Sequence, residues 1–230
     1  MPGFTDKTSL ISSMISGNNL TWDIIIIGGG ITGAGVLREA VRRGYRALLI
    51  EQNDFSWGTS SRSSKMIHGG LRYLAAGDYK LTKESVQERQ KLLEEAPGLV
   101  YPILFFFSFR KGLFPGPLIM KIIMLIYDKY ASKKDHRFFK NAELSKKFKN
   151  LNEKNLKGAV AYTDAMVDDS RLVLRVLQDS IDLGGYAINY TEAKELIIKN
   201  SKVVGVKIQD KTSSTLLSLK APTVINATGA

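Results

Sequence analysis

The stretch Asp23-Ile-Ile-Ile-Ile-Gly-Gly-Gly-Ile-Thr-Gly33 decides the fold class of this 230-residue chain. Residues 23–27 form a short β-branched run that ends at three glycines, which is typical of a buried parallel strand. Residues 31–43 carry apolar side chains at helical spacing and stop at Gly44, so they predict a helix. Residues 46–50 predict a second strand. The chain therefore opens with a βαβ unit.

The spacing of the glycines has a mechanical explanation. Gly28 permits a tight turn, Gly30 lets the backbone approach a pyrophosphate, and Gly33 lets the helix lie close to the strand. The helix N-terminus offers N–H groups and a partial positive charge to phosphates. Glu51 ends the second strand, where a carboxylate can accept hydrogen bonds from ribose hydroxyls. The pattern predicts an adenine dinucleotide site; the alternative is a coincidental glycine turn with a surface glutamate.

Composition narrows the class of protein. The chain is 44% hydrophobic and 24% charged, as is ordinary for a globular protein, and its net charge is +11. That excess suits a polyanion, an anionic membrane surface or a phosphorylated small molecule, or is simply a basic surface. The lysines of residues 133–157 are not regularly interleaved with aromatic residues, so we expect no nucleic-acid module. The absence of cysteine excludes disulfides, iron–sulfur clusters and thiolate zinc, and we expect no metal site.

The first half of the chain holds further predicted segments. Residues 1–20 are expected to be a flexible tail that docks by one helical turn. A polar loop at 53–70 precedes a helix at 79–95. Residues 99–127 are apolar, but charged residues and prolines keep every run well below the roughly 18 residues of a spanning helix. They predict core packing, with a membrane-surface helix at 118–127 as the alternative.

The second half changes from helix to strand. Residues 141–157 are predicted to be irregular, and a helix at 171–183 follows a cap at Asp169 or Ser170. The end of the chain predicts an antiparallel β meander and a final strand, at residues 194–199, 202–209, 215–220 and 223–226. Because the chain stops at Ala230 directly after a strand, we expect a fragment of a longer protein.

One long segment points to a family. Gly58-Thr-Ser-Ser-Arg-Ser-Ser-Lys-Met-Ile-His-Gly-Gly-Leu-Arg-Tyr73 resembles the hallmark of the FAD-dependent glycerol-3-phosphate dehydrogenases and oxidases. Further matches are Tyr127-Asp128, Tyr162-Thr-Asp164, Val167-Asp-Asp-Ser-Arg-Leu-Val173 and Val224-Ile-Asn-Ala-Thr-Gly229. The resemblance covers residues 20–230.

The resemblance implies a fold and its parts. The fold is a truncated α/β, Rossmann-like FAD-binding domain of the glutathione reductase/D-amino acid oxidase type with an inserted antiparallel β meander. We expect the oxidoreductase domain to fill residues 21–230. Its parts would be the βαβ unit at 23–51, a flavin and substrate loop at 53–73, a helical and partial substrate region at 79–185, and the meander with a flavin-contacting strand at 186–230.

The resemblance also implies the site residues. FAD would be contacted by Gly28, Gly29, Gly30, Ile31, Thr32, Gly33, Glu51, Gln52, Thr59, Ser60, Ser61, Ser63, Ser64, Lys65, His68, Gly69, Gly70, Ala227, Thr228 and Gly229. Arg72 and Tyr73 would face the substrate, because a guanidinium suits a phosphate. A surface ion pair remains the alternative for Arg72, and a loop histidine for His68. Asp164, Asp168, Asp169 and Arg171 look like a metal or acid/base cluster, but a helix start and an ion pair explain them more simply.

The resemblance implies a reaction and a location. The whole protein would transfer a hydride from glycerol 3-phosphate to FAD, giving dihydroxyacetone phosphate, and pass electrons to a quinone. The general base is expected after residue 230, so no catalytic residue is assigned. We expect a cytoplasmic protein at the inner face of the cell membrane, bound peripherally, and a homodimer is compatible with the resemblance.

Three alternatives stay open. Oxygen instead of a quinone would make the protein a glycerol-3-phosphate oxidase. The same fold also serves FAD-dependent amine and hydroxy-acid oxidases. From a different class, a nucleic-acid- or membrane-binding module could use the net charge of +11 with a vestigial nucleotide site.

Overall fold

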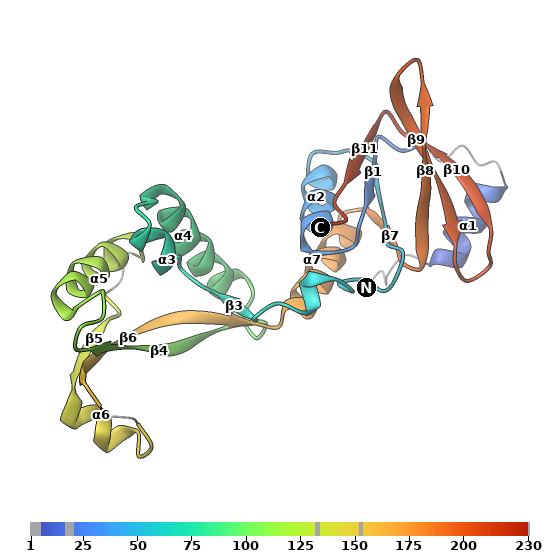
Figure 1. Cartoon of the computed structure of the whole chain (residues 1–230). Helices are drawn as coiled ribbons and strands as arrows, with labels where there is room; N and C mark the ends of the chain where they lie inside the picture. The colour runs from blue at the N-terminus through green and yellow to red at the C-terminus, as the bar shows by residue number, and fades with distance from the viewer. Residues whose placement is uncertain (1–5, 17–20, 132–133, 152–153, 230) are drawn as a thin grey trace. The chain divides into compact units, whose positions relative to one another are not determined.

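The computed structural model describes residues 6–16, 21–131, 134–151 and 154–229 (Figure 1). The chain forms two compact units. Unit 1 combines Met1–Ser63 with Asp169–Ala230, and unit 2 is Ser64–Asp168. The glycine turn and the β meander therefore lie in unit 1, whereas the segment from His68 to Tyr73 lies in unit 2.

A parallel sheet forms the centre of unit 1. Its strands stand in the order β11 (Thr223–Asn226), β1 (Ile24–Ile27), β2 (Ala47–Ile50) and β7 (Tyr186–Ile188). β1 pairs in parallel with β2 on one side and with β11 on the other. The three predicted strands of this sheet are confirmed, and β7 is an addition that the sequence did not predict.

The parallel sheet is covered on both faces. Side chains alternate along β1, so that Ile26 packs with α2 (Ile31–Arg42) and α7 (Asp169–Asp182), while Ile25 packs toward the meander. Figure 1 shows the two helices on one side of the sheet and the meander on the other. The meander consists of β8 (Thr191–Lys199), β9 (Lys202–Asp210) and β10 (Leu216–Lys220), and it is antiparallel as predicted. Burial on both faces explains the unbroken isoleucine run of β1.

The N-terminal region forms a helix longer than the single turn predicted for it. α1 runs Lys7–Ile15, and the side chain of Asp6 caps it by accepting from the Thr8 N–H. Leu10 packs into the core beneath the meander. The prediction of a flexible tail is thus wrong for residues 7–15, and the rest of that prediction, at 1–5 and 17–20, lies outside the described residues.

Unit 2 is built on an antiparallel sheet. Its strands are β3 (Met66–Ile67), β6 (Leu156–Val167) and β4 (Val100–Arg110) in that order, with β5 (Arg137–Lys140) also paired to β6. Its helices are α3 (Leu71–Ala75), α4 (Tyr79–Glu95), α5 (Pro117–Ala131) and α6 (Asn141–Lys147). α4 confirms the predicted helix at 79–95. Elsewhere in residues 79–185, α5 and α7 fit the expected helical region, but the long strands β4 and β6 were not predicted, and α6 replaces the irregular structure predicted from 141.

The apolar residues 99–127 divide between core and surface. β4 pairs with β6 along its length, and Met120 and Met124 of α5 pack against Phe109 and Val160. Core packing is therefore correct for one side of α5. The other side of α5 is exposed, so the prediction that residues 99–127 pack in the core is wrong for that side. Among the described residues, no helix is both long enough and apolar enough to cross a membrane.

Candidate cofactor site

The glycine turn joins β1 to α2 and comes close to the end of β11. Gly28 has a φ of +113°, in the region that favours glycine, and a Cβ there would stand 2.6 Å from the carbonyl oxygen of Ala227. A Cβ at Gly33 would overlap the carbonyl oxygen of Gly28. The predicted reasons for these two glycines, a tight turn and a close approach of helix to strand, are therefore confirmed. Ile31 and Thr32 are exposed at the first turn of α2.

Glu51 is tied to the glycine turn by its carboxylate. One oxygen accepts from the Gly29 N–H at 2.7 Å, and the other accepts from the Asn53 N–H at 2.8 Å. The backbone of Glu51 is fixed as well, because its N–H donates to Ile188 of β7 at 2.9 Å. The carboxylate is thus held at the carboxyl edge of the parallel sheet, where open α/β sheets bind ligands.

The serine-rich segment brings one predicted side chain to the start of α2. The hydroxyl of Ser60 accepts from the Ile31 N–H at 3.0 Å. The Ser61 hydroxyl donates within its own turn, to the carbonyl oxygens of Gly58 and Trp57. Ser60 therefore lies where a helix N-terminus can hold an anion, and Ser61 does not point its donor there. Thr59 is exposed beside them.

Ser63 is attached to the start of α7. Its hydroxyl donates to the Asp169 carboxylate at 2.8 Å, and its N–H donates to the same oxygen at 3.2 Å. Asp169 is the first residue of α7, so the interpretation of this residue as a helix start is confirmed. Asp164, which the sequence grouped with it, belongs to unit 2.

A cavity of about 210 Å³ adjoins these groups within unit 1. Three residues that the resemblance assigns to FAD line it, Gly28, Glu51 and Gln52, together with Trp57. The start of β8 also lines it, with Thr191, Glu192 and Ala193. No sequence pattern marked these three residues, because only the return of the meander beside β2 brings them to the glycine turn.

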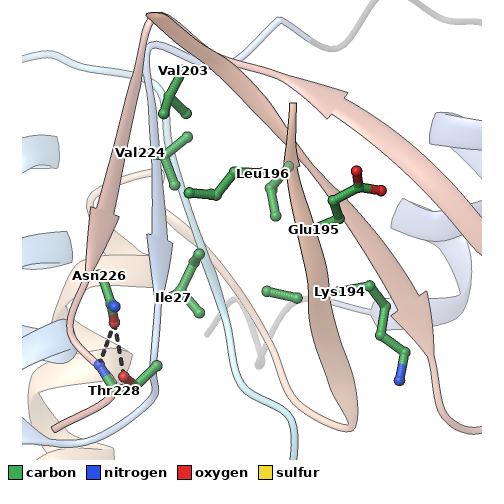
Figure 2. A pocket seen from close by; sticks show the side chains of 10 residues that line it. Ile27, Lys194, Glu195, Leu196, Val203, Val224, Asn226 and Thr228 are labelled. Carbon is green, nitrogen blue, oxygen red and sulfur yellow. Dashed lines mark hydrogen bonds between the residues drawn. The ribbon is translucent and has the colours of Figure 1, made fainter. Parts of the chain in front are cut away.

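A second cavity, of about 290 Å³, lies between the meander and the parallel sheet. Figure 2 shows Ile27 and Val224 on the sheet side and Leu196 on the meander side. At its edge the Asn226 side chain accepts from both the N–H and the hydroxyl of Thr228, at 3.1 and 2.8 Å. These bonds hold the turn that carries the predicted residues Ala227, Thr228 and Gly229.

The remaining predicted residues lie in unit 2. Ser64, Lys65 and His68 are exposed, and Gly69 and Gly70 are buried. The ring of Tyr73 packs against Gly70, since a Cβ added at Gly70 would stand 2.7 Å from Cδ2 of Tyr73. The Tyr73 ring also meets the His68 ring edge-on, with the two ring centroids 5.9 Å apart. The side chain of Arg72 lies outside what the structure describes.

A buried cluster behind this segment was missed by the sequence prediction. Arg89 of α4 pairs with Asp164 of β6 at 2.7 Å, and it donates to the Tyr127 hydroxyl of α5 at 2.5 Å. The Asp164 carboxylate also accepts from the Gly69 N–H at 2.8 Å. Burial raises the pKa of Tyr127 well above its ordinary range, and Asp164 adds to that effect while Arg89 opposes it. Arg89 carries no motif, so no sequence signal could have placed it here.

His136, to which the sequence assigned no role, pairs with Asp128 of α5. Its Nδ1 lies 2.7 Å from the Asp128 carboxylate, and both side chains are largely buried. The other oxygen of Asp128 accepts from the Asp135 N–H at 3.3 Å. The pair joins α5 to the segment before β5.

Comparison with known proteins gives a consistent result. The family model for DAO, FAD dependent oxidoreductase, matches residues 23–230. The aerobic glycerol-3-phosphate dehydrogenase of Bacillus subtilis (strain 168) is 37% identical over 212 residues, which are 91% of this chain and 38% of that protein. The chain thus spans well under half the length of this curated relative.

Solved structures share the fold. The crystal structure of the glycerol-3-phosphate dehydrogenase from Bacillus halodurans complexed with FAD has a TM-score of 0.73 at 28% identity, over 96% of this chain and 37% of that one. L-proline dehydrogenase from P. horikoshii has a TM-score of 0.68 at 22% identity, over 91% of this chain and 53% of that one, which shows the fold alone. The predicted α/β FAD-binding fold is confirmed.

Proposed function

The chain belongs to the FAD dependent oxidoreductase family, and on this premise we propose that the whole protein oxidises sn-glycerol 3-phosphate to dihydroxyacetone phosphate. FAD would supply the redox chemistry by accepting the hydride from C2 of the substrate. The observation that carries this proposal is the identity of 37% to an aerobic glycerol-3-phosphate dehydrogenase over 91% of the chain. The hallmark segment from Gly58 to Tyr73 supports it.

The residues of unit 1 fit the adenosine and pyrophosphate part of FAD. An ionised carboxylate has about four lone-pair sites, so Glu51 can accept from ribose hydroxyls while it holds Gly29 and Asn53. A hydroxyl that accepts one bond keeps a hydrogen to donate, so Ser60 can serve a phosphate oxygen beside the N-terminus of α2. The cavity beside Glu51 and β8 would take the adenine.

The residues of unit 2 would serve the flavin and the substrate. Ser64, Lys65, His68, Gly69 and Gly70 would contact FAD. Arg72 would hold the substrate phosphate through two parallel hydrogen bonds, and Tyr73 would stand beside it. This assignment rests on the hallmark segment, and the packing of the Tyr73 ring on Gly70 supports it by fixing the orientation of that ring.

Flavin bleaching tests the substrate. The natural full-length protein is mixed without oxygen with glycerol 3-phosphate, and in separate samples with L-proline and with glycine. We expect the flavin absorbance to fall only with glycerol 3-phosphate. Reduction by an amino acid instead would replace this function with that of an amine oxidase. If the purified protein instead carried no flavin and bound RNA tightly, this result would favour the alternative function of a nucleic-acid-binding module.

The electron acceptor is proposed to be a quinone, which requires contact with a membrane. The outward side of α5 offers a surface for it, with Leu118 75% and Ile122 55% exposed and Lys121 between them. In the preceding loop Leu113 and Phe114 are exposed as well. Apolar side chains beside lysines are typical of a helix that lies on an anionic bilayer. We therefore place the protein at the cytoplasmic face of the cell membrane.

Reoxidation distinguishes the acceptors. The reduced full-length protein is mixed with a short-chain quinone or with oxygenated buffer, and the return of flavin absorbance is followed. Fast reoxidation by the quinone with little hydrogen peroxide is expected of the dehydrogenase. Fast reoxidation by oxygen with stoichiometric peroxide would identify an oxidase.

A further inference from the structure

The backbone of the His68–Tyr73 segment is held by side chains from three elements of unit 2. Asp164 of β6 accepts from the Gly69 N–H at 2.8 Å. The Thr82 hydroxyl of α4 lies 3.4 Å from the Gly70 carbonyl oxygen while it donates to the Asp78 carbonyl oxygen at 2.8 Å. A Cβ at Gly69 would overlap the hydroxyl of Tyr127 of α5, so this helix packs directly against the glycine backbone. The two glycines are therefore fixed by contacts from outside the segment.

The carboxylate that holds Gly69 is itself fixed. Arg89 and Asp164 are 4% and 3% exposed, and their ion pair of 2.7 Å is joined by the Tyr127 hydroxyl, which donates to Asp164 at 3.2 Å. Arg89 also donates to the Thr163 carbonyl oxygen at 3.0 Å. A charge in a buried site is costly unless it is paired and hydrogen-bonded. Here Nη1 of Arg89 and the Asp164 carboxylate are paired, while Nε of Arg89 is buried without a hydrogen-bond partner among the described residues.

Stability alone is a poor reason for such an arrangement. A buried ion pair can often be replaced by apolar residues of similar volume with no loss of stability. A carboxylate differs from an apolar group because it fixes the direction of the N–H that donates to it. In this cluster that N–H belongs to Gly69, in the middle of the segment that carries the proposed flavin and substrate contacts.

We infer that Arg89, Asp164 and Tyr127 are positioning residues, which hold the backbone of the His68–Tyr73 segment in the position that hydride transfer requires. The inference rests on the proposed function, since that function assigns His68, Gly69 and Gly70 to the flavin and Arg72 and Tyr73 to the substrate. A displacement of about 1 Å in such a site can lower the rate by about 100-fold. The three residues act on the reaction through the backbone that they hold.

The test uses two variants of the natural full-length flavoprotein. Asp164→Asn leaves the Arg89 charge unpaired, and Tyr127→Phe removes only a hydroxyl. At full FAD occupancy we expect flavin reduction by saturating glycerol 3-phosphate to slow by about 10- to 100-fold in D164N. The expected slowing in Y127F is about fivefold, the typical effect of one lost hydrogen bond. The amide of Gly69 should exchange its hydrogen faster in both.

Asp128→Asn is the matched control, because it breaks a second largely buried ion pair of unit 2, between Asp128 of α5 and His136. It should lower the unfolding midpoint while the reduction rate per bound flavin and the exchange at Gly69 stay at wild-type values. Equal rate losses in D128N and D164N would overturn the inference, as would wild-type exchange at Gly69 in D164N. If glycerol 3-phosphate fails to reduce even the wild-type flavin, the proposed function fails, and the exchange data still decide whether the cluster holds the segment.

Discussion

The carboxylate of Glu51 accepts a hydrogen bond from the backbone N–H of Gly29 at 2.7 Å. This bond joins the end of β2 to the turn that follows β1, so a direct hydrogen bond connects the two parts of the dinucleotide pattern. The second oxygen accepts from Asn53 at 2.8 Å and fixes the rotation of the carboxylate. A site that is already ordered loses less conformational entropy when its ligand binds.

Glu51→Gln should weaken FAD binding by about 10- to 100-fold, the range for a hydrogen bond that involves a charged group. The amide nitrogen of glutamine cannot accept, so either Gly29 or Asn53 loses its acceptor, and the ribose loses one as well. Titration of the apoprotein with FAD measures the change. Glu39→Gln, on the exposed side of α2, is the control and should bind FAD normally. Unchanged affinity in E51Q would remove Glu51 from the site.

Gly33→Ala should unfold unit 1 or abolish its FAD binding, because the new Cβ would overlap the Gly28 carbonyl oxygen. Gly35→Ala is a close control in the same helix, since a Cβ there would have none of the described residues within 4 Å apart from its chain neighbours and the backbone of its own helix. That exposed substitution should raise the free energy of unfolding by about 0.5–1 kcal/mol, because alanine favours helix over glycine. Thermal melts and FAD titrations of the two variants measure both effects. Equal stability of G33A and G35A would contradict the close packing of α2 on β1.

Ser60→Ala should weaken FAD binding more than Ser61→Ala does. The family resemblance treats the two serines alike, but only Ser60 reaches the N-terminus of α2, at 3.0 Å from the Ile31 nitrogen. The Ser61 hydroxyl is directed to its own turn. We expect about a fivefold loss of affinity for S60A, as for one neutral hydrogen bond, and little change for S61A. The reverse order would show that the segment rearranges when the cofactor binds.

Local patterns predicted the parts of unit 1 well. The run from Ile24 to Ile27 is β-branched and ends at glycine, and the meander turns at Asn200-Ser201, where both residues have positive φ. These signals lie within a few residues of the structure they specify. β7 was missed because Tyr186–Ile188 is only three residues long and depends on its pairing with β2.

Unit 2 was poorly predicted for a physical reason. β4 is a nearly continuous apolar run from Val100 to Arg110 that contains Pro102, so its periodicity does not distinguish strand from helix. β6 mixes small, apolar and polar residues without regular alternation, and its strand structure comes from pairing with β4 and β5. Long-range pairing of this kind leaves little trace in the local sequence.

The residues of the candidate site also divide into a part of unit 1 that the sequence predicted and a part of unit 2 that it did not. The glycine turn, Glu51 and Ser60 were predicted and are brought together in unit 1. Arg89 could not be predicted, because a single arginine in a polar helix looks like a surface residue. Its burial depends on Asp164, which is 75 residues away in the sequence.

Replacing Leu118 and Ile122 by glutamate should release the full-length protein from membranes. Both side chains are exposed on α5, and the new carboxylates would be repelled by anionic lipid while they lose apolar contact. Sedimentation with vesicles of phosphatidylglycerol and phosphatidylcholine measures binding. The control carries glutamate at Ile198 and Leu216 of the meander, which are also exposed, 62% and 68%. Equal binding by both double variants and the wild type would exclude this side of α5 as the contact surface.

Asp210 should make the stability of unit 1 depend on pH in the acid range. Burial alone would raise the pKa of its carboxyl, but hydrogen bonds from Lys7, Ser213 and Thr212 hold that pKa well below its usual range. Because this pKa is lower in the folded chain than in the unfolded chain, the ionised carboxylate stabilises the fold at any pH above the unfolded pKa, which is about 3.9 for aspartate. The stabilisation is lost as the pH falls from there through the lower folded-state pKa.

Asp210→Asn removes this dependence and provides the measurement. Urea unfolding of the wild type and D210N is followed from pH 7 to pH 3. The difference in unfolding free energy should be constant at neutral pH and should shrink as the pH falls below about 4. Lys7→Met should give an intermediate result, because it removes the ion pair that joins α1 to β9 and leaves the Ser213 and Thr212 bonds. A difference that stays constant down to pH 3 would mean that Asp210 titrates alike in the folded and unfolded chain.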